Sequence, residues 1–287
     1  MSGERLFSGI AVPPNPRTAE PGMVPRSPMP REHGAWGVLY GAFLGGAVVV
    51  GRLSVPVLLL LVTITALAFL NGPLTILARR SSAPLSSSDR ARLARWLFAW
   101  GGLAAAAGLP LLLVYDMTFL LLFGLAGLGF LSIRLVAVRR QADRTLWGEL
   151  IGTTGLALAG PAVHAVAVGG VQPRAGILWL LLILFFASGI FYVRMRIRGL
   201  AALRRGTTEP DPSRIACIAY HLLLLGIVPT LAAVGAVSWW APLAFAPALT
   251  RAAAGLRRLS APLNVRRLGW SEVALTAAFV LSLPLFM

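Results

Sequence analysis

The chain has 287 residues, of which 57% are hydrophobic and only 13% are charged, with a mean hydropathy of +0.78. This composition leaves too little polar surface for a soluble domain, so it excludes a soluble protein and predicts an integral membrane protein. All 26 basic residues are arginines, and the formal net charge is +16. Because the arginines lie in short segments between apolar runs, they indicate membrane topology and contact with anionic lipid rather than a nucleic-acid partner.

Residues 1–30 contain seven of the twenty prolines and no apolar run. A segment of this composition buries little surface, so we predict a disordered cytoplasmic tail. The tail lacks the apolar core of a secretory signal peptide, and we expect no such peptide. We predict that residues 31–287 form one transmembrane domain.

Apolar runs long enough to cross about 30 Å of hydrocarbon follow the tail. The sequence predicts nine spans, at residues 34–50, 53–78, 96–114, 117–138, 145–168, 176–193, 215–236, 239–256 and 270–287. The eighth is the weakest, because Pro242 and Pro247 interrupt it, and we expect a kinked or broken helix there. Before the third, the segment from Ser86 to Arg90 is typical of a helix N-cap. The expected fold class is an all-α, polytopic membrane bundle.

Arginine is distributed unevenly between the two sides of these spans. It gathers in the tail and in the segments after the second, fourth, sixth and eighth spans, whereas the opposite side has only Arg52 and Arg174. Cytoplasmic segments retain an excess of positive charge. We therefore predict a multi-pass protein of the bacterial cytoplasmic membrane, with its N-terminus in the cytoplasm and its C-terminus outside.

Polar side chains at membrane depth favour the inner ends of the spans. Charges inside a membrane are costly and usually face a bundle interior or a cavity. A cytoplasm-facing polar cavity is the simplest common explanation. The candidate catalytic residues are Glu32, His33 and Glu149, and the candidate ligand-binding residues are Trp36, Asn71, Arg79, Arg134, Tyr192, Arg194, Arg198 and His221.

These residues have chemical roles that suit an anionic ligand. Arg79, Arg194 and Arg198 would hold a phosphate by bidentate hydrogen bonds, and Asn71 would orient it. Glu32 or Glu149 would act as a base, with His33 and His221 as proton donors. No metal site is expected, since Cys217 and His221 have no visible third ligand.

Structural alternatives remain open for the same residues. Arg134, Arg194 and Arg198 are equally compatible with side chains that reach the head groups, and Glu149 with neutralisation of Arg134 or Arg144. Glu32 and His33 can instead cap the first span, with Arg31 and Trp36 as interface anchors. Small residues in the first span, Gly41, Gly45 and Gly46, indicate close helix packing.

Four short motifs carry a resemblance to a known family: Arg31-Glu32-His33-Gly34-Ala35-Trp36, Pro84-Leu85, Phe191-Tyr192-Val193-Arg194 and Arg267-Leu268-Gly269-Trp270-Ser271-Glu272. With these motifs the chain resembles the YwiC-like family of bacterial membrane proteins over most of residues 30–287. The resemblance implies a membrane protein and no particular reaction.

The chain is more distantly similar to the UbiA-type membrane prenyltransferases. That resemblance implies a UbiA-like arrangement of nine helices and a site facing the cytoplasm, where Asp-rich motifs hold the Mg²⁺ of a prenyl diphosphate. Only Asn71 matches the first motif, and Gly72 stands at the following aspartate position. Span six ends in arginines instead of carboxylates, so the Asp-rich motifs that would support Mg²⁺ as a cofactor are missing.

Three functions fit these observations. The first is an enzyme or enzyme-derived protein that binds or processes an anionic isoprenoid or lipid head group in the cytoplasm-facing cavity. The alternatives are a membrane carrier or permease, and an accessory membrane subunit without a small ligand. The sequence identifies no protein partner.

Overall fold

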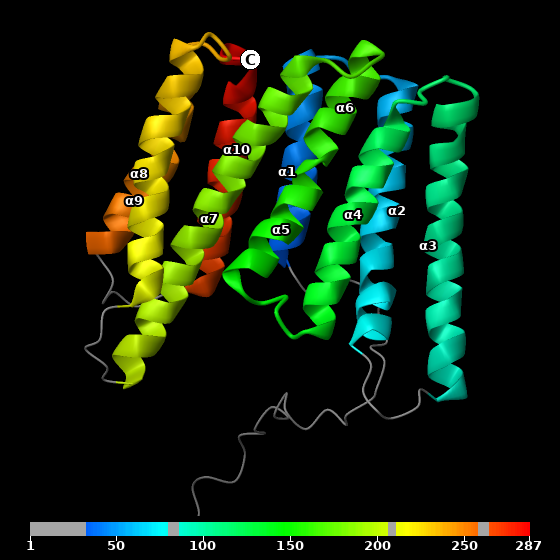
Figure 1. Ribbon diagram of the computed structural model, residues 1–287, viewed down its shortest axis with the longest axis horizontal. Helices are drawn as coiled ribbons and strands as arrows, with labels where there is room; N and C mark the ends of the chain where they lie inside the picture. The colour runs from blue at the N-terminus through cyan, green and yellow to red at the C-terminus, as the bar shows by residue number, and fades with distance from the viewer. Residues whose placement is uncertain (1–32, 80–85, 206–210, 258–263) are drawn as a thin grey trace, which may run out of the picture.

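The structure is a computed structural model that describes residues 33–79, 86–205, 211–257 and 264–287 (Figure 1). In these ranges the chain is helical, with no strand. The helices are α1 (His33–Val50), α2 (Val55–Ala78), α3 (Ser87–Leu113), α4 (Leu120–Arg139), α5 (Leu146–Ala157), α6 (Ala159–Val168), α7 (Pro173–Arg205), α8 (Pro212–Ala233), α9 (Ala241–Arg257) and α10 (Val265–Ser282), followed by the short 3₁₀-helix η1 (Leu283–Leu285). The predicted tail, residues 1–30, lies outside the described residues.

The helices run alternately in opposite directions along one bundle (Figure 1). At one end of the bundle, the lower end in Figure 1, α2, α4, α7 and α9 finish and α3, α5, α8 and α10 start. We call it the basic end. Each predicted span coincides with a helix, or with the pair α5 and α6, and the all-α, polytopic fold class is confirmed. Among the described residues, seven helical segments are long and apolar enough to cross a membrane. Of the other two, α1 is a shorter apolar helix and α9 contains Pro247.

Four of the helices that start at the basic end have side-chain N-caps. The caps are Ser86 for α3, Thr145 for α5, Asp211 for α8 and Asn264 for α10, and each side chain accepts a hydrogen bond from a backbone N–H of the first turn. Such a cap satisfies an N–H group that has no partner within the helix. The predicted N-cap before the third span is therefore confirmed, and it belongs to Ser86.

The fifth span is broken into α5 and α6 at Leu158. Pro161 explains the break, because it has no N–H to donate to the carbonyl four residues earlier and its ring crowds that carbonyl. Leu158 instead donates its backbone N–H to the Gly155 carbonyl in a tighter turn. The two helices still form one candidate membrane span, Leu146–Val168.

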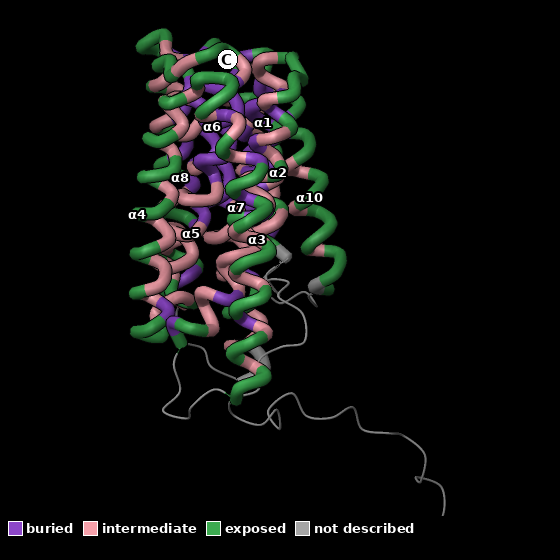
Figure 2. Tube along the Cα trace, turned by 90° about the vertical axis from the view of Figure 1, so that its right-hand side faces the viewer, coloured by how far each residue is buried: buried purple, intermediate pink, exposed green. Residues whose placement is uncertain are grey.

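The interior of the bundle is built around α1, α6 and α7. Figure 2 shows the buried residues gathered inside the bundle, while α3 and α4 present long exposed faces. Helix α1 packs most closely on α6, because Gly46 lies against the backbone carbonyl of Gly160, and a Cβ atom at Gly46 would clash with that oxygen. Close packing by the glycines of the first span, as expected from the sequence, is thus visible at Gly46.

Candidate functional site

A cavity of about 700 Å³ lies between α1, α2, α3, α4, α5 and α6. We call it the apolar cavity, because its walls are mostly Leu, Ala and Gly and its polar side chains are few. The polar groups are Thr63, Asn71, Arg134 and the indole of Trp36. Thr63 already donates its hydroxyl to the Leu59 carbonyl at 2.9 Å. Asn71, Arg134 and Trp36 are therefore the groups that give the cavity its chemical character.

These three groups lie at one end of the apolar cavity. Trp36 is in the first turn of α1, Asn71 is about two turns before the end of α2, and Arg134 is about one and a half turns before the end of α4. All three positions are near the basic end. The lining continues along α4 to Leu120, about 21 Å beyond Arg134 at 1.5 Å per residue. The cavity is thus polar at the basic end and hydrocarbon-like along the rest of its length.

Glycines of α5 bring α4 close to the cavity. A Cβ atom at Gly152 would lie 3.1 Å from Nη1 of Arg134, and one at Gly155 would lie 2.8 Å from Cβ of Phe130. Larger residues at these two positions would displace the α4 side chains. Because Gly152 and Gly155 have no side chains, α4 can lie close to α5, and this sets the position of Arg134 in the cavity wall.

Aromatic rings that do not themselves line the cavity pack beside Trp36. Trp36 stacks on Tyr40 with ring centroids 5.6 Å apart and contacts Phe69 at 5.0 Å. Phe69 in turn stacks on Trp100 of α3 at 4.2 Å. Stacked rings of this kind add stability beyond the area that they bury. They link α1, α2 and α3 at the basic end of the cavity.

A second pocket of about 330 Å³ lies on the other side of α5, between the segment from Arg144 to Leu146, the end of α7 and the start of α8. We call it the basic pocket, because Arg144, Arg194 and Arg198 line it. Arg194 forms a 2.8 Å ion pair with Glu149 of α5, and it also donates to the backbone carbonyl of Arg144 at 3.2 Å. Glu149 thus neutralises Arg194, which the sequence did not single out as its partner.

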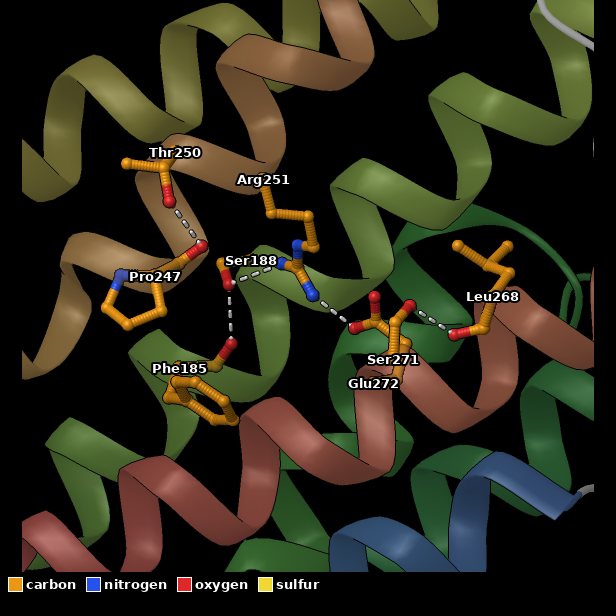
Figure 3. A network of polar contacts seen from close by, with 8 residues as sticks. All are labelled: Phe185, Ser188, Pro247, Thr250, Arg251, Leu268, Ser271 and Glu272. Atoms are coloured by element: carbon orange, nitrogen blue, oxygen red, sulfur yellow. Dashed lines mark hydrogen bonds and ion pairs between the residues drawn. The ribbon is translucent and has the colours of Figure 1, made fainter.

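A partly buried ion pair joins α9 to α10 in a third place (Figure 3). Arg251 of α9 donates to the carboxylate of Glu272 and, at 3.2 Å, to the hydroxyl of Ser188 on α7. Its guanidinium also lies over the ring of Tyr192, 4.6 Å from the centroid. Tyr192 packs closely against Gly255. This network connects three helices through one arginine.

Neither Arg251 nor Glu272 was among the candidate residues, although the predicted eighth span, 239–256, contains Arg251. In the structure α9 continues past Pro247 to Arg257, so Arg251 is inside the helix and its side chain is only 10% exposed. The signal was present in the sequence: Arg251 and Glu272 are opposite charges at similar depth in consecutive spans.

Two further candidates, Arg79 and His221, line neither pocket. Arg79 forms a 2.5 Å ion pair with Asp143 at the exposed basic end. His221 is buried in α8, with Nδ1 2.7 Å from the carbonyl oxygen of Cys217. Glu32 lies outside the described residues, and His33 begins α1 without a described side chain. In the described part of the chain, no three His, Cys, Asp or Glu side chains are grouped as a metal site would need.

Comparison with known proteins finds one family match, and it covers part of the chain. Residues 29–164 match the model of the YwiC-like protein family, which confirms the resemblance seen in the sequence over that segment. Every residue that lines the apolar cavity falls within it. No curated protein matches the chain, and no solved structure does. The UbiA-like arrangement therefore stays a prediction.

Proposed function

Taking the chain as an integral membrane protein that is YwiC-like over residues 29–164, we propose that its apolar cavity binds an amphiphile with one hydrocarbon chain and an anionic head group. The hydrocarbon chain of the amphiphile would lie along α4, and its head group would lie at Arg134 and Asn71. The observation that carries this proposal is the uneven polarity of the cavity. Trp36, Asn71 and Arg134 are at one end, and about 21 Å of apolar wall follow them along α4.

The residues at the polar end suit an anionic head group. A guanidinium offers several N–H donors in one plane and holds a carboxylate or phosphate by two parallel hydrogen bonds. Asn71 adds amide hydrogen-bonding groups from α2, and its Oδ1 lies 3.5 Å from the Thr75 hydroxyl. The indole of Trp36 is typical of the boundary between hydrocarbon and head groups. An isoprenoid phosphate and a fatty acid both have the required shape and charge.

The arginines at the basic end support an orientation with that end in the cytoplasm of a bacterium. The polar end of the cavity would then lie at the depth of the inner leaflet. A lipid or isoprenoid from that leaflet would enter with its head group already at the correct level. The proposal concerns binding and does not require turnover.

Two glycines on α4 allow a direct test of this proposal. Gly127 lines the apolar cavity and has open space where a Cβ atom would be, so Phe in its place would fill the cavity without a clash. Gly129 also has open space but does not line the cavity and is exposed. Gly129→Phe is therefore a matched control on the same helix.

The experiment measures binding of radiolabelled farnesyl phosphate and, separately, palmitate to the purified protein in detergent. We expect at least one probe to bind the unaltered protein, Gly127→Phe to weaken that binding at least tenfold, and Gly129→Phe to leave it unchanged. The probe that binds identifies an isoprenoid or an acyl ligand. Absence of binding by both probes, or equal binding by the two variants, would contradict the proposal.

A further inference from the structure

The basic pocket has features that the proposed amphiphile does not use. It shares no lining residue with the apolar cavity, and α5 lies between the two. Its three guanidinium groups come from two separate parts of the chain: Arg144 precedes α5, while Arg194 and Arg198 are four residues apart on α7 and therefore share a face of that helix. Phe191, Leu146 and Ala216 give the pocket apolar sides.

The charges of this pocket are only partly balanced. Glu149 neutralises Arg194. Within the described ranges, Arg144 and Arg198 form no ion pair. The nearby carboxylate of Asp211 caps α8, since it accepts hydrogen bonds from the backbone N–H and the hydroxyl of Ser213. Even with Asp211 counted, the lining keeps an excess of positive charge.

The depth of the pocket can be estimated from α7. This helix begins at the opposite end of the bundle at Pro173, and about twenty helical residues cross about 30 Å of hydrocarbon. The hydrocarbon therefore ends close to Arg194, and Arg198 is one turn further out. Trp147 in the first turn of α5 is 73% exposed. Exposed tryptophans are enriched at the boundary between hydrocarbon and head groups, so Trp147 indicates the same depth for this boundary. The pocket thus lies where phosphate groups of lipids are found.

From this charge and depth we infer that the basic pocket binds a phosphate group, which competes with Glu149 for Arg194. Arg144 and Arg198 would contribute the other donors, and the phosphate would take the place of the Glu149 carboxylate at Arg194. The source of the phosphate is either the head group of an inner-leaflet lipid or a free phosphate ion. The apolar sides formed by Phe191 and Leu146 favour the lipid.

This competition gives two substitutions with opposite effects. Glu149→Gln removes the competing carboxylate, so phosphate should bind severalfold more tightly. Arg198→Gln removes a charge-assisted hydrogen bond, so phosphate should bind about tenfold more weakly. A purely structural role of the Glu149 and Arg194 pair would not tighten binding when Glu149 is replaced. Arg214→Gln is a control, because Arg214 is exposed next to the pocket but does not line it.

The test measures binding of short-chain dihexanoyl phosphatidic acid and of inorganic phosphate to the purified full-length protein in a neutral detergent. Binding of the lipid alone identifies a lipid head-group site, and binding of both identifies a site for phosphate from either source. In each case Glu149→Gln must tighten binding and Arg198→Gln must weaken it, relative to Arg214→Gln. The inference is overturned if neither probe binds, or if the first two variants match the control. Gly127→Phe should leave this binding intact, so a failure of the amphiphile proposal would be distinguishable from a failure here.

Discussion

The first half of the bundle and the second half treat charge at membrane depth differently. In the first half, helices α1 to α6 surround a cavity, and Arg134 lies in its wall. In the second half, Arg251 and Glu272 are directed toward each other, and Ser188 and Tyr192 complete the contact (Figure 3). An arginine within a span is therefore a different feature in each half. Arg251 holds helices together, whereas Arg134 lies in the wall of a cavity.

The largest effect should come from the ion pair of the second half. Arg251→Met leaves Glu272 as a partly buried charge without its partner, and Glu272→Leu leaves Arg251 in the same state, so each should lower the free energy of unfolding by up to about 3–5 kcal/mol. The double variant removes both charges and should be more stable than either single variant. Equilibrium unfolding in mixed micelles measures all three. If the loss of unfolding free energy in the double variant equals the sum of the two single losses, the two charges are not coupled. The contrast drawn between the two halves would then be wrong.

A smaller effect on the free energy of unfolding is expected at the packing contact between α1 and α6. Gly46→Ala places a methyl group against the backbone carbonyl of Gly160, which cannot move without shifting α6. Overpacking of this kind typically costs about 1–3 kcal/mol. Gly37→Ala on the same helix is the control, because nothing lies within 4 Å of its Cβ position. The same unfolding measurement should separate the two variants, and equal stability would show that α1 and α6 do not depend on this contact.

Asn71→Leu should have little effect on stability, because it replaces one polar group of a cavity wall by an apolar one of similar size. We expect the free energy of unfolding to change by less than about 1 kcal/mol. Binding of the amphiphile probe should nevertheless weaken about tenfold, since a hydrogen bond to a charged group is lost. The affinity for the amphiphile probe and the free energy of unfolding should both be measured on the same preparation of Asn71→Leu and of the unaltered protein. A large loss of stability with unchanged binding would make Asn71 a structural residue like Arg251.

The smallest effect is expected for the exposed ion pair at the basic end. Arg79 and Asp143 are 2.5 Å apart, but the Arg79 side chain is 48% exposed. Exposed pairs of this kind contribute about 0–1 kcal/mol. Arg79→Gln should therefore leave unfolding and probe binding almost unchanged. A change as large as that of Arg251→Met would mean that this pair acts as a buried contact.

The sequence predicted how deep a residue lies along its helix better than it predicted which side chains that residue contacts. The helices could be located because hydrocarbon thickness sets the length of an apolar run, and Ser86 could be recognised as a cap because capping is local. Which way a helix turns its polar side chains depends on the packing of glycines such as Gly152, and that packing is not local. Arg134 and Arg194 have similar depths in the sequence, yet α5 separates their pockets. Arg251 lies within the predicted eighth span, but its partner Glu272 is on another helix, and their contact depends on packing that is not local either.

The central position of α1 has a consequence for the order of assembly. Its glycines are covered by parts of the chain that are synthesised much later: a Cβ atom at Gly41 would lie 2.8 Å from Thr276 of α10, and one at Gly45 would lie 3.0 Å from Leu283 of η1. Until those segments are inserted, this face of α1 must be covered by lipid or by an assisting protein. The bundle therefore cannot mature progressively from its N-terminal end. A nascent chain stopped after α9 should remain more sensitive to protease than the full chain, although it contains eight of the nine predicted spans.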